Sequence, residues 1–271
     1  MKTLVKLLLA AALLGGILLT VGVWNGGQLY TGYENGALRP FFGLRGTYDS
    51  GAVENGTCEV NDPESIDVLR LEVAAGSCEI EMGDRLRWSG DVDADTNGGT
   101  LTLTTRAGES EIILPEHKFD ELTVAISGGA LDAERLNAGA GVIEITGGAA
   151  DIDQFYAYSA RIEGSMGAVE IDSLYARSAD LHISAGELRA DALYVDQITA
   201  KCTGGQMSLG LPRDPASYRC TADVTAGAAL WNGSSLSSAG FGGADAAYTL
   251  DLTVTAGQIA LYPHPAPDSH S

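Results

Sequence analysis

Apolar and polar residues alternate along short segments in the middle of the chain, and these segments recur at a fixed interval. Each segment contains a glycine, and five successive glycines stand nineteen residues apart: Gly129, Gly148, Gly167, Gly186 and Gly205. Looser copies of the segment surround Gly76, Gly108, Gly227 and Gly257. Alternation with a period of two is typical of a strand that buries one face. The pattern therefore predicts a repeat built from strands.

When the repeats are aligned on the glycine, the residues at certain fixed offsets from it are small or apolar. Five residues before it stand Val124, Ile143, Ile162, Leu181 and Ala200. Two residues after it stand Leu131, Ala150, Val169, Leu188 and Met207. Seven residues after it, in the first four repeats, stand Leu136, Phe155, Leu174 and Leu193. Each repeat is predicted to be a strand, a glycine turn that often needs a positive φ, a second strand and a return.

Two architectures fit this pattern. In an antiparallel meander each glycine closes a hairpin, and hairpin turns favour Asn-Gly or Asp-Gly. In a parallel β-solenoid each repeat is one coil, and equivalent residues stack about 4.8 Å apart. The constant step, and a turn that reads Ser or Thr, a small residue and Gly, favour the solenoid. We predict an all-β, parallel β-solenoid with coils of about 19 residues.

The N-terminus predicts export. Lys2 and Lys6 precede an uncharged apolar run from Leu7 to Trp24, which is long enough to span a bilayer at about 1.5 Å per residue. The lysines should stay cytoplasmic and direct the rest of the chain outward. A cleavable signal peptide is the alternative, with Thr20-Val21-Gly22 as a passable cleavage site. We expect an uncleaved transmembrane anchor and a single-pass protein of the cell membrane whose C-terminal domain is extracellular.

The predicted organisation has four parts. Residues 1–24 form the transmembrane signal-anchor, and residues 25–60 a glycine-rich stalk and cap. Residues 61–262 form the solenoid, with a Gly/Ser/Ala-rich loop at 231–247 and a final strand pair after it. Residues 263–271 form a disordered tail.

The net charge of −20 restricts the classes of partner that the protein can bind. An acidic surface repels phosphate backbones, which excludes nucleic acid, and it repels anionic lipid headgroups. It attracts cations and basic partners, or it serves only to keep an exposed domain soluble.

The chain resembles the bacterial β-strand-repeat adhesin family, which has no established function. The resemblance covers about residues 60–262 and is carried by the repeats together with Ile66–Val73, Gly83-Asp84, Gly99–Leu103, Ile112–Pro115, Leu211-Pro212 and Leu252–Ile259. It implies a right-handed β-solenoid that faces outward from the membrane. It implies no catalytic residue.

Outward columns are the candidate binding face. Acids stand three residues after the glycine at Asp132, Asp151 and Glu170, followed by Arg189. Five residues after it stand Glu134, Asp153, Asp172 and Asp191. A column of carboxylates is either a low-affinity Ca²⁺ face, since Ca²⁺ takes several oxygen ligands, or a solvated acidic face. Ca²⁺ is the one cofactor that the sequence suggests.

A tyrosine column lies beside the acids, eight residues after the glycine, at Tyr156, Tyr175 and Tyr194. Tyrosines and carboxylates together can bind a carbohydrate, whereas a ladder of identical aromatic residues is also an ordinary stabiliser of stacked strands. The predicted face, for a glycan or protein ligand, comprises Asp153, Asp172, Asp191, Tyr156, Tyr175 and Tyr194.

The cysteines give two expectations. Cys58 and Cys78 are about one coil apart, so they can stack and form a disulfide in an exported protein. Cys202 and Cys220 occupy different columns, which places them beyond the roughly 7 Å limit for bridging and makes Cys202 a buried thiol. Without a C-x-x-C pair, structural zinc is not expected.

Motifs for catalysis are missing from the sequence: it has no H-E-x-x-H, no G-x-S-x-G and no phosphate loop. We therefore expect a non-enzymatic extracytoplasmic surface module for binding, adhesion or envelope sensing. The alternative is a polysaccharide-active lyase or hydrolase that uses Asp153, Asp172 and Asp191 on neighbouring coils.

Overall fold

The computed structural model describes residues 29–34, 37–42, 57–60, 63–236, 240–243 and 245–264. No helix within these residues is long and apolar enough to cross a membrane. The predicted anchor at 1–24 and most of the predicted tail at 263–271 lie outside the described residues, as does most of the predicted stalk. The anchor therefore stays a prediction.

Two compact units divide the chain at Thr47 and Tyr48. In the first, β1 (Leu29–Glu34) and β2 (Ala37–Phe42) form an antiparallel pair. The second unit holds every other described strand in one sheet system.

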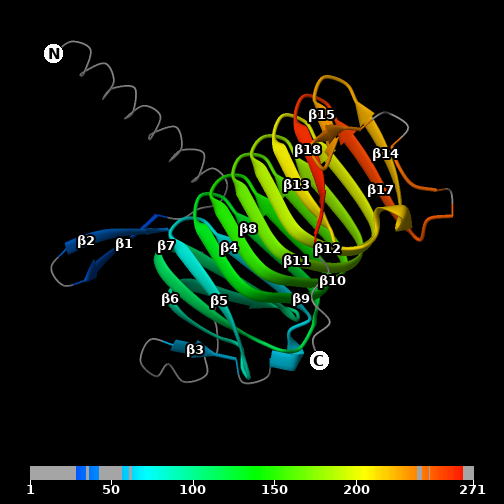
Figure 1. Cartoon of the computed structure of the whole chain (residues 1–271). Helices are drawn as coiled ribbons and strands as arrows, with labels where there is room; N and C mark the ends of the chain where they lie inside the picture. Colours follow the sequence, from blue (N-terminus) through cyan, green and yellow to red (C-terminus); the bar gives the residue numbers. More distant parts are fainter. Residues whose placement is uncertain are drawn as a thin grey trace, which may run out of the picture. The chain divides into compact units, whose positions relative to one another are not determined.

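The regular part of the second unit is a stack of parallel coils (Figure 1). Its strands are β8 (Phe119–Ile126), β9 (Ala130–Ile145), β10 (Ala149–Gly164), β11 (Ala168–Ile183), β12 (Glu187–Cys202) and β13 (Gln206–Leu211). Each of β9 to β12 is one bent strand of 16 residues, and three-residue turns separate them. Each pairs in parallel with the next at a shift of nineteen, so Ile143, Ile162 and Leu181 are direct neighbours. The parallel solenoid is confirmed, and the meander is excluded.

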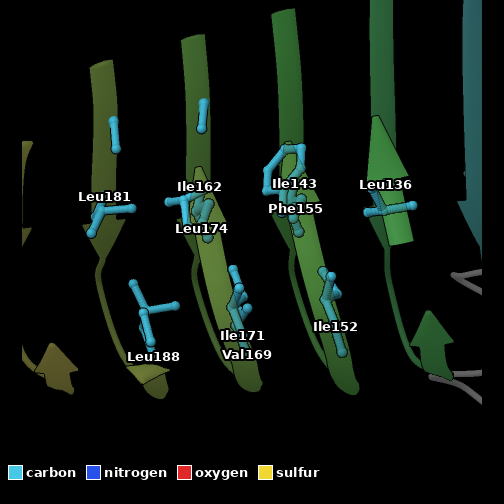
Figure 2. Packing of buried hydrophobic residues seen from close by; sticks show 14 of the residues in the cluster. Leu136, Ile143, Ile152, Phe155, Ile162, Val169, Ile171, Leu174, Leu181 and Leu188 are labelled. Atoms are coloured by element: carbon cyan, nitrogen blue, oxygen red, sulfur yellow. The ribbon is translucent and has the colours of Figure 1, made fainter. Parts of the chain in front are cut away.

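The core is built from the predicted columns. Figure 2 shows Ile143, Ile162 and Leu181 at equivalent places on successive strands, and all three are fully buried. Residues before the glycine and residues after it point into the same core cluster, which extends through the whole stack. Each coil thus contributes two sheet faces around one shared interior.

The turn glycines stack directly on one another. The N–H of Ala149 donates to the Gly129 carbonyl at 3.0 Å, and that of Ala168 donates to the Gly148 carbonyl at 3.1 Å. A Cβ on Gly148, whose φ is +94°, would overlap the Gly129 carbonyl oxygen. Gly205 lies outside the positive-φ region, yet a Cβ there would overlap the Gly186 carbonyl oxygen. Close stacking of the turns requires glycine here, even where φ is ordinary.

The coils do not stack in chain order at the N-terminal end. The coil formed by β4 (Val68–Val73) and β5 (Ser77–Gly83) lies between β7 (Thr100–Pro115) on one side and β8 with β9 on the other. The first full coil of the chain is therefore the second in space.

The C-terminal end shows the same exchange. β17 (Tyr248–Val254) lies between β12 and β14 (Tyr218–Val224), and β18 (Gln258–Pro263) lies between β13 and β15 (Ala228–Trp231). The predicted strand pair after residue 247 is confirmed, but it is inserted one coil inward. We call β17 and β18 the inserted coil.

Antiparallel strands cover both ends of the stack. β6 (Arg87–Asn97) pairs with β7, and β3 (Thr57–Glu59) pairs with the start of β6. At the other end, β16 (Ser234–Ser235) pairs with β15, and Phe241 bridges Cys220. Two short 3₁₀ helices lie among the described residues, η1 (Pro63–Ser65) and η2 (Pro215–Ser217).

The predicted stacking of Cys58 on Cys78 is wrong. Two strands, β7 and β6, separate β5 from β3, which places the backbones of the two cysteines at least about 14 Å apart, beyond the roughly 7 Å limit. Cys78 is a free thiol, and burial raises its pKa to about 12. Cys202 is a buried free thiol as predicted, and it donates to the Gly205 carbonyl at 3.1 Å.

Glycine stacking predicts a difference between two alanine variants. Gly148 and Gly108 both have positive φ, but only Gly148 has a carbonyl oxygen in the path of a Cβ. Gly108→Ala should lower the free energy of unfolding by roughly 1–2 kcal/mol through backbone strain alone. Gly148→Ala should cost about 1–3 kcal/mol more because of overlap. Urea denaturation measures both, and equal losses would contradict stacking as the cause.

The inserted coil predicts the effect of a truncation after Ala247. Without β17 and β18, the strands β14 and β15 lose their parallel partners. Trypsin should then cleave the truncated chain after Arg213 within a time in which the full chain stays intact, because local opening exposes the backbone. Equal protection of both chains would mean that β14 docks directly on β12.

Candidate binding face

The half of each coil that follows the glycine displays outward carboxylates on six adjacent coils. Outward positions one, three and five residues after the glycine, on six adjacent coils, define the acidic face. Its carboxylates are Glu79, Glu81, Glu109, Glu111, Asp132, Glu134, Asp151, Asp153, Glu170, Asp172, Glu187 and Asp191. Arg189 is the one base at these positions. The parallel register collects carboxylates from residues far apart in the chain on a single surface.

Asp153, Asp172 and Asp191 stack as the sequence predicts, because the residues on either side of them pair in register. Partial burial and the charges of Asp153 and Asp191 raise the pKa of the Asp172 carboxyl. Burial acts in the same direction on Asp191, but hydrogen bonds from Arg189 and Tyr262 outweigh it and lower its pKa. Adjacent carboxyls of one column therefore shift in opposite directions.

Asp191 is held by two neighbours. Arg189 donates through Nε to Asp191 Oδ1 at 2.8 Å and through Nη2 to Oδ2 at 3.0 Å, and its Nη1 lies 3.1 Å from Glu170 Oε1. The Tyr262 hydroxyl, from the inserted coil, donates to Asp191 Oδ1 at 2.8 Å. Both carboxylate oxygens of Asp191 thus have hydrogen-bond donors already.

Carboxylates of the acidic face do not converge into a metal-binding set. Within the described part of the chain, no three His, Cys, Asp or Glu side chains come close enough together to hold an ion. The geometry offers no support for the Ca²⁺ interpretation.

The tyrosine column forms a stacked ladder. The ring centroids of Tyr156 and Tyr175 are 4.6 Å apart at an interplanar angle of 5°, and those of Tyr175 and Tyr194 are 4.7 Å apart at 3°. The Arg135 guanidinium lies 5.9 Å from the Tyr156 centroid. Both faces of the Tyr175 ring are therefore covered, and the ladder presents ring edges to solvent. This geometry favours its role as a stabiliser of the stack.

A groove on the acidic face was missed by the sequence analysis. It has a volume of about 750 Å³, and its lining includes the exposed alanines Ala130, Ala149 and Ala168, one residue after each glycine. Asp132, Asp151 and Glu170 also line it. The column of small residues was the available signal in the sequence, but only the register shows that it becomes a trough.

A protein-family model, Toastrack DUF4097, matches residues 54–227 of the chain. The chain belongs to the Toastrack DUF4097 family. The resemblance to a repeat family of unknown function is thereby confirmed, and the inserted coil lies beyond the residues of the match. No curated protein matches the chain.

Solved structures are similar to this Toastrack chain at low sequence identity. A putative adhesin from Bacteroides fragilis is 14% identical with a TM-score of 0.46, and the match covers 76% of this chain and 95% of that one. A putative adhesin from Parabacteroides distasonis is 14% identical with a TM-score of 0.45, covering 76% and 94%. A putative cell adhesion protein from Clostridium sporogenes is 11% identical with a TM-score of 0.33, covering 76% and 97%.

The raised pKa of Asp172 predicts a stabilising variant. A carboxyl whose pKa is higher in the folded than in the unfolded state lowers stability once it ionises, and the loss disappears as pH falls below its unfolded value. Asp172→Asn should therefore raise the melting temperature at pH 7, and the two proteins should melt together near pH 3. Asp180→Asn, on the other sheet face, is the matched control. A variant that melts below the parent at pH 7 would contradict the repulsion.

Proposed function

We propose that this Toastrack protein is a non-enzymatic, extracytoplasmic binding module, of adhesin or envelope-sensing type, that is anchored in the cell membrane by residues 1–24. The observation that supports binding most directly is the acidic face, where twelve carboxylates stand beside one arginine on parallel strands. Holding like charges this close together costs electrostatic free energy, and a surface with only a structural role would not require it.

The proposed location rests on the N-terminal sequence. Lys2 and Lys6 ahead of the apolar run from Leu7 to Trp24 have the charge bias of a segment that keeps its N-terminus inside the cell. The negative charge of the domain also opposes adsorption to anionic headgroups. A domain held near a membrane in this way stays available for a ligand in the envelope.

The proposed ligand is a glycan or a protein of the cell surface. Asp153 and Asp172 are exposed, whereas Asp191 is occupied by Arg189 and Tyr262. The half-buried tyrosines offer ring edges and hydroxyl groups beside these acids. A ligand that binds here would meet a polar surface rich in hydrogen-bond acceptors.

One observation favours the second candidate, a polysaccharide lyase or hydrolase. Neighbouring carboxyls whose pKa values move in opposite directions are the arrangement that acid–base catalysis uses, and Asp172 and Asp191 meet that description. Against it, the hydrogen bonds from Arg189 and Tyr262 leave Asp191 without a free oxygen for a reacting group.

Binding and cleavage are separated by one experiment. The full chain, in a non-ionic detergent, is incubated with washed cell envelopes and with isolated cell-wall and plant glycans. We expect retention on envelope material and no new reducing ends or unsaturated products. Cleavage by the parent protein that Asp172→Asn abolishes would overturn the non-enzymatic proposal, and absence of retention on every material would overturn the binding proposal.

A further inference from the structure

The groove combines two kinds of surface, exposed methyl groups and a row of carboxylates. The methyl groups of Ala130, Ala149 and Ala168 are exposed along it. A row of carboxylates from Asp132, Asp151 and Glu170 lies immediately beside them. An occupant must therefore carry positive charge and also present apolar atoms.

The length of the groove sets the length of the occupant. Its lining extends from the coil of Glu109 to the coil of Arg189, which is six coils in the stacking order. At about 4.8 Å per strand the six coils extend over roughly 24 Å, which equals about seven residues of an extended peptide at 3.3 Å each. A short linear segment fits this length.

Charge complementarity selects a basic segment. Glu79, Glu109 and Glu187 extend the acidic lining toward both ends, and Arg189 is its one base. Arg189 is already engaged by Asp191 and Glu170. Lysine and arginine suit the two surfaces because their aliphatic stems pack on methyl groups while their charged ends reach carboxylates.

A carbohydrate fits the lining less well, since the groove has no aromatic ring on which a sugar can stack. Strand addition is also not the mode of binding here, because each of β9, β10 and β11 is hydrogen-bonded to a strand on both sides. The occupant must lie across the strands and bind through side chains.

We propose that this groove binds an extended, lysine- or arginine-rich polypeptide segment of about seven residues. The inference deepens the proposed binding function, on which it rests, by naming the chemistry of the partner and the groove that binds it. Alanine methyls contact the stems of the basic side chains, and Asp132 and Asp151 pair with their charges, while Glu170, which also engages Arg189, adds negative charge to the lining.

Isothermal titration of the full chain in a non-ionic detergent with the peptide (Lys-Ala)₅ tests the proposal. We expect binding that weakens at least fivefold between about 0.05 and about 0.5 M salt, because salt screens exposed charges. The acidic peptide (Glu-Ala)₅ should not bind. The triple variant Asp132→Asn, Asp151→Asn, Glu170→Gln should bind (Lys-Ala)₅ at least tenfold more weakly.

A control of equal charge change lies on other sheet faces of the stack: Glu121→Gln, Glu144→Gln, Asp223→Asn, all exposed in the parent. It should weaken binding by less than about threefold. Ala149→Trp fills the groove without changing charge and should weaken binding at least tenfold, and its melting temperature checks that the stack is intact.

Equal weakening by the two triple variants would show that net charge alone attracts the peptide and would overturn the inference. Unchanged binding by Ala149→Trp would overturn it as well. Binding of glucosamine oligomers but not of (Lys-Ala)₅ would sink the peptide site while leaving the proposed surface-binding function in place. Failure to retain any envelope material would remove the broader proposal instead.

Discussion

The parallel hydrogen-bonded register between successive coils is the constraint on which this structure depends. A single coil buries too little apolar surface to order its own backbone, so each coil is stable only between neighbours. The register aligns Ile143, Ile162 and Leu181 in one core column, and the glycine turns allow it by stacking carbonyl on amide without side chains between them. Insertion of one residue into a coil would shift one of its faces from the interior to solvent.

The same register determines the chemistry of the surface. Residues nineteen apart in the chain become neighbours in space, so a modest preference for acid at one offset becomes a continuous column of charge. The direction in which the pKa of each carboxyl shifts then depends on its neighbours. Asp172 lies between like charges, whereas Asp191 accepts hydrogen bonds from Arg189 and Tyr262. The tyrosines at another offset form a stacked ladder, and their ring faces pack against one another within the protein.

The regular coils were predictable from sequence because their signal is periodic. The offsets of the glycines and of columns such as Ile152 and Ile171 suffice to assign strands, inward faces and the stacking of the acids and tyrosines. The order of the coils at both ends was not predictable, since it depends on the paths of connections that carry no period, at 84–86 and 116–118 near one end and at 212–217 near the other. Errors and omissions follow from that order: the pairing expected for Cys58, and the contact of Tyr262 with Asp191, which requires the inserted coil. The groove was missed because a column of small side chains indicates a hollow in the surface only when the positions of the neighbouring strands are known.

The exchange of coil order at the two ends has a mechanical consequence. A pull on the chain ahead of β3 first reaches a strand of three residues, and then the coil of β4 and β5, which is hydrogen-bonded on both sides. Unravelling that coil must break two ladders together, whereas a terminal coil of a simply ordered stack would peel away by breaking one. The inserted coil opposes tension from the C-terminus in the same way. The topology therefore resists being unwound by force from either end.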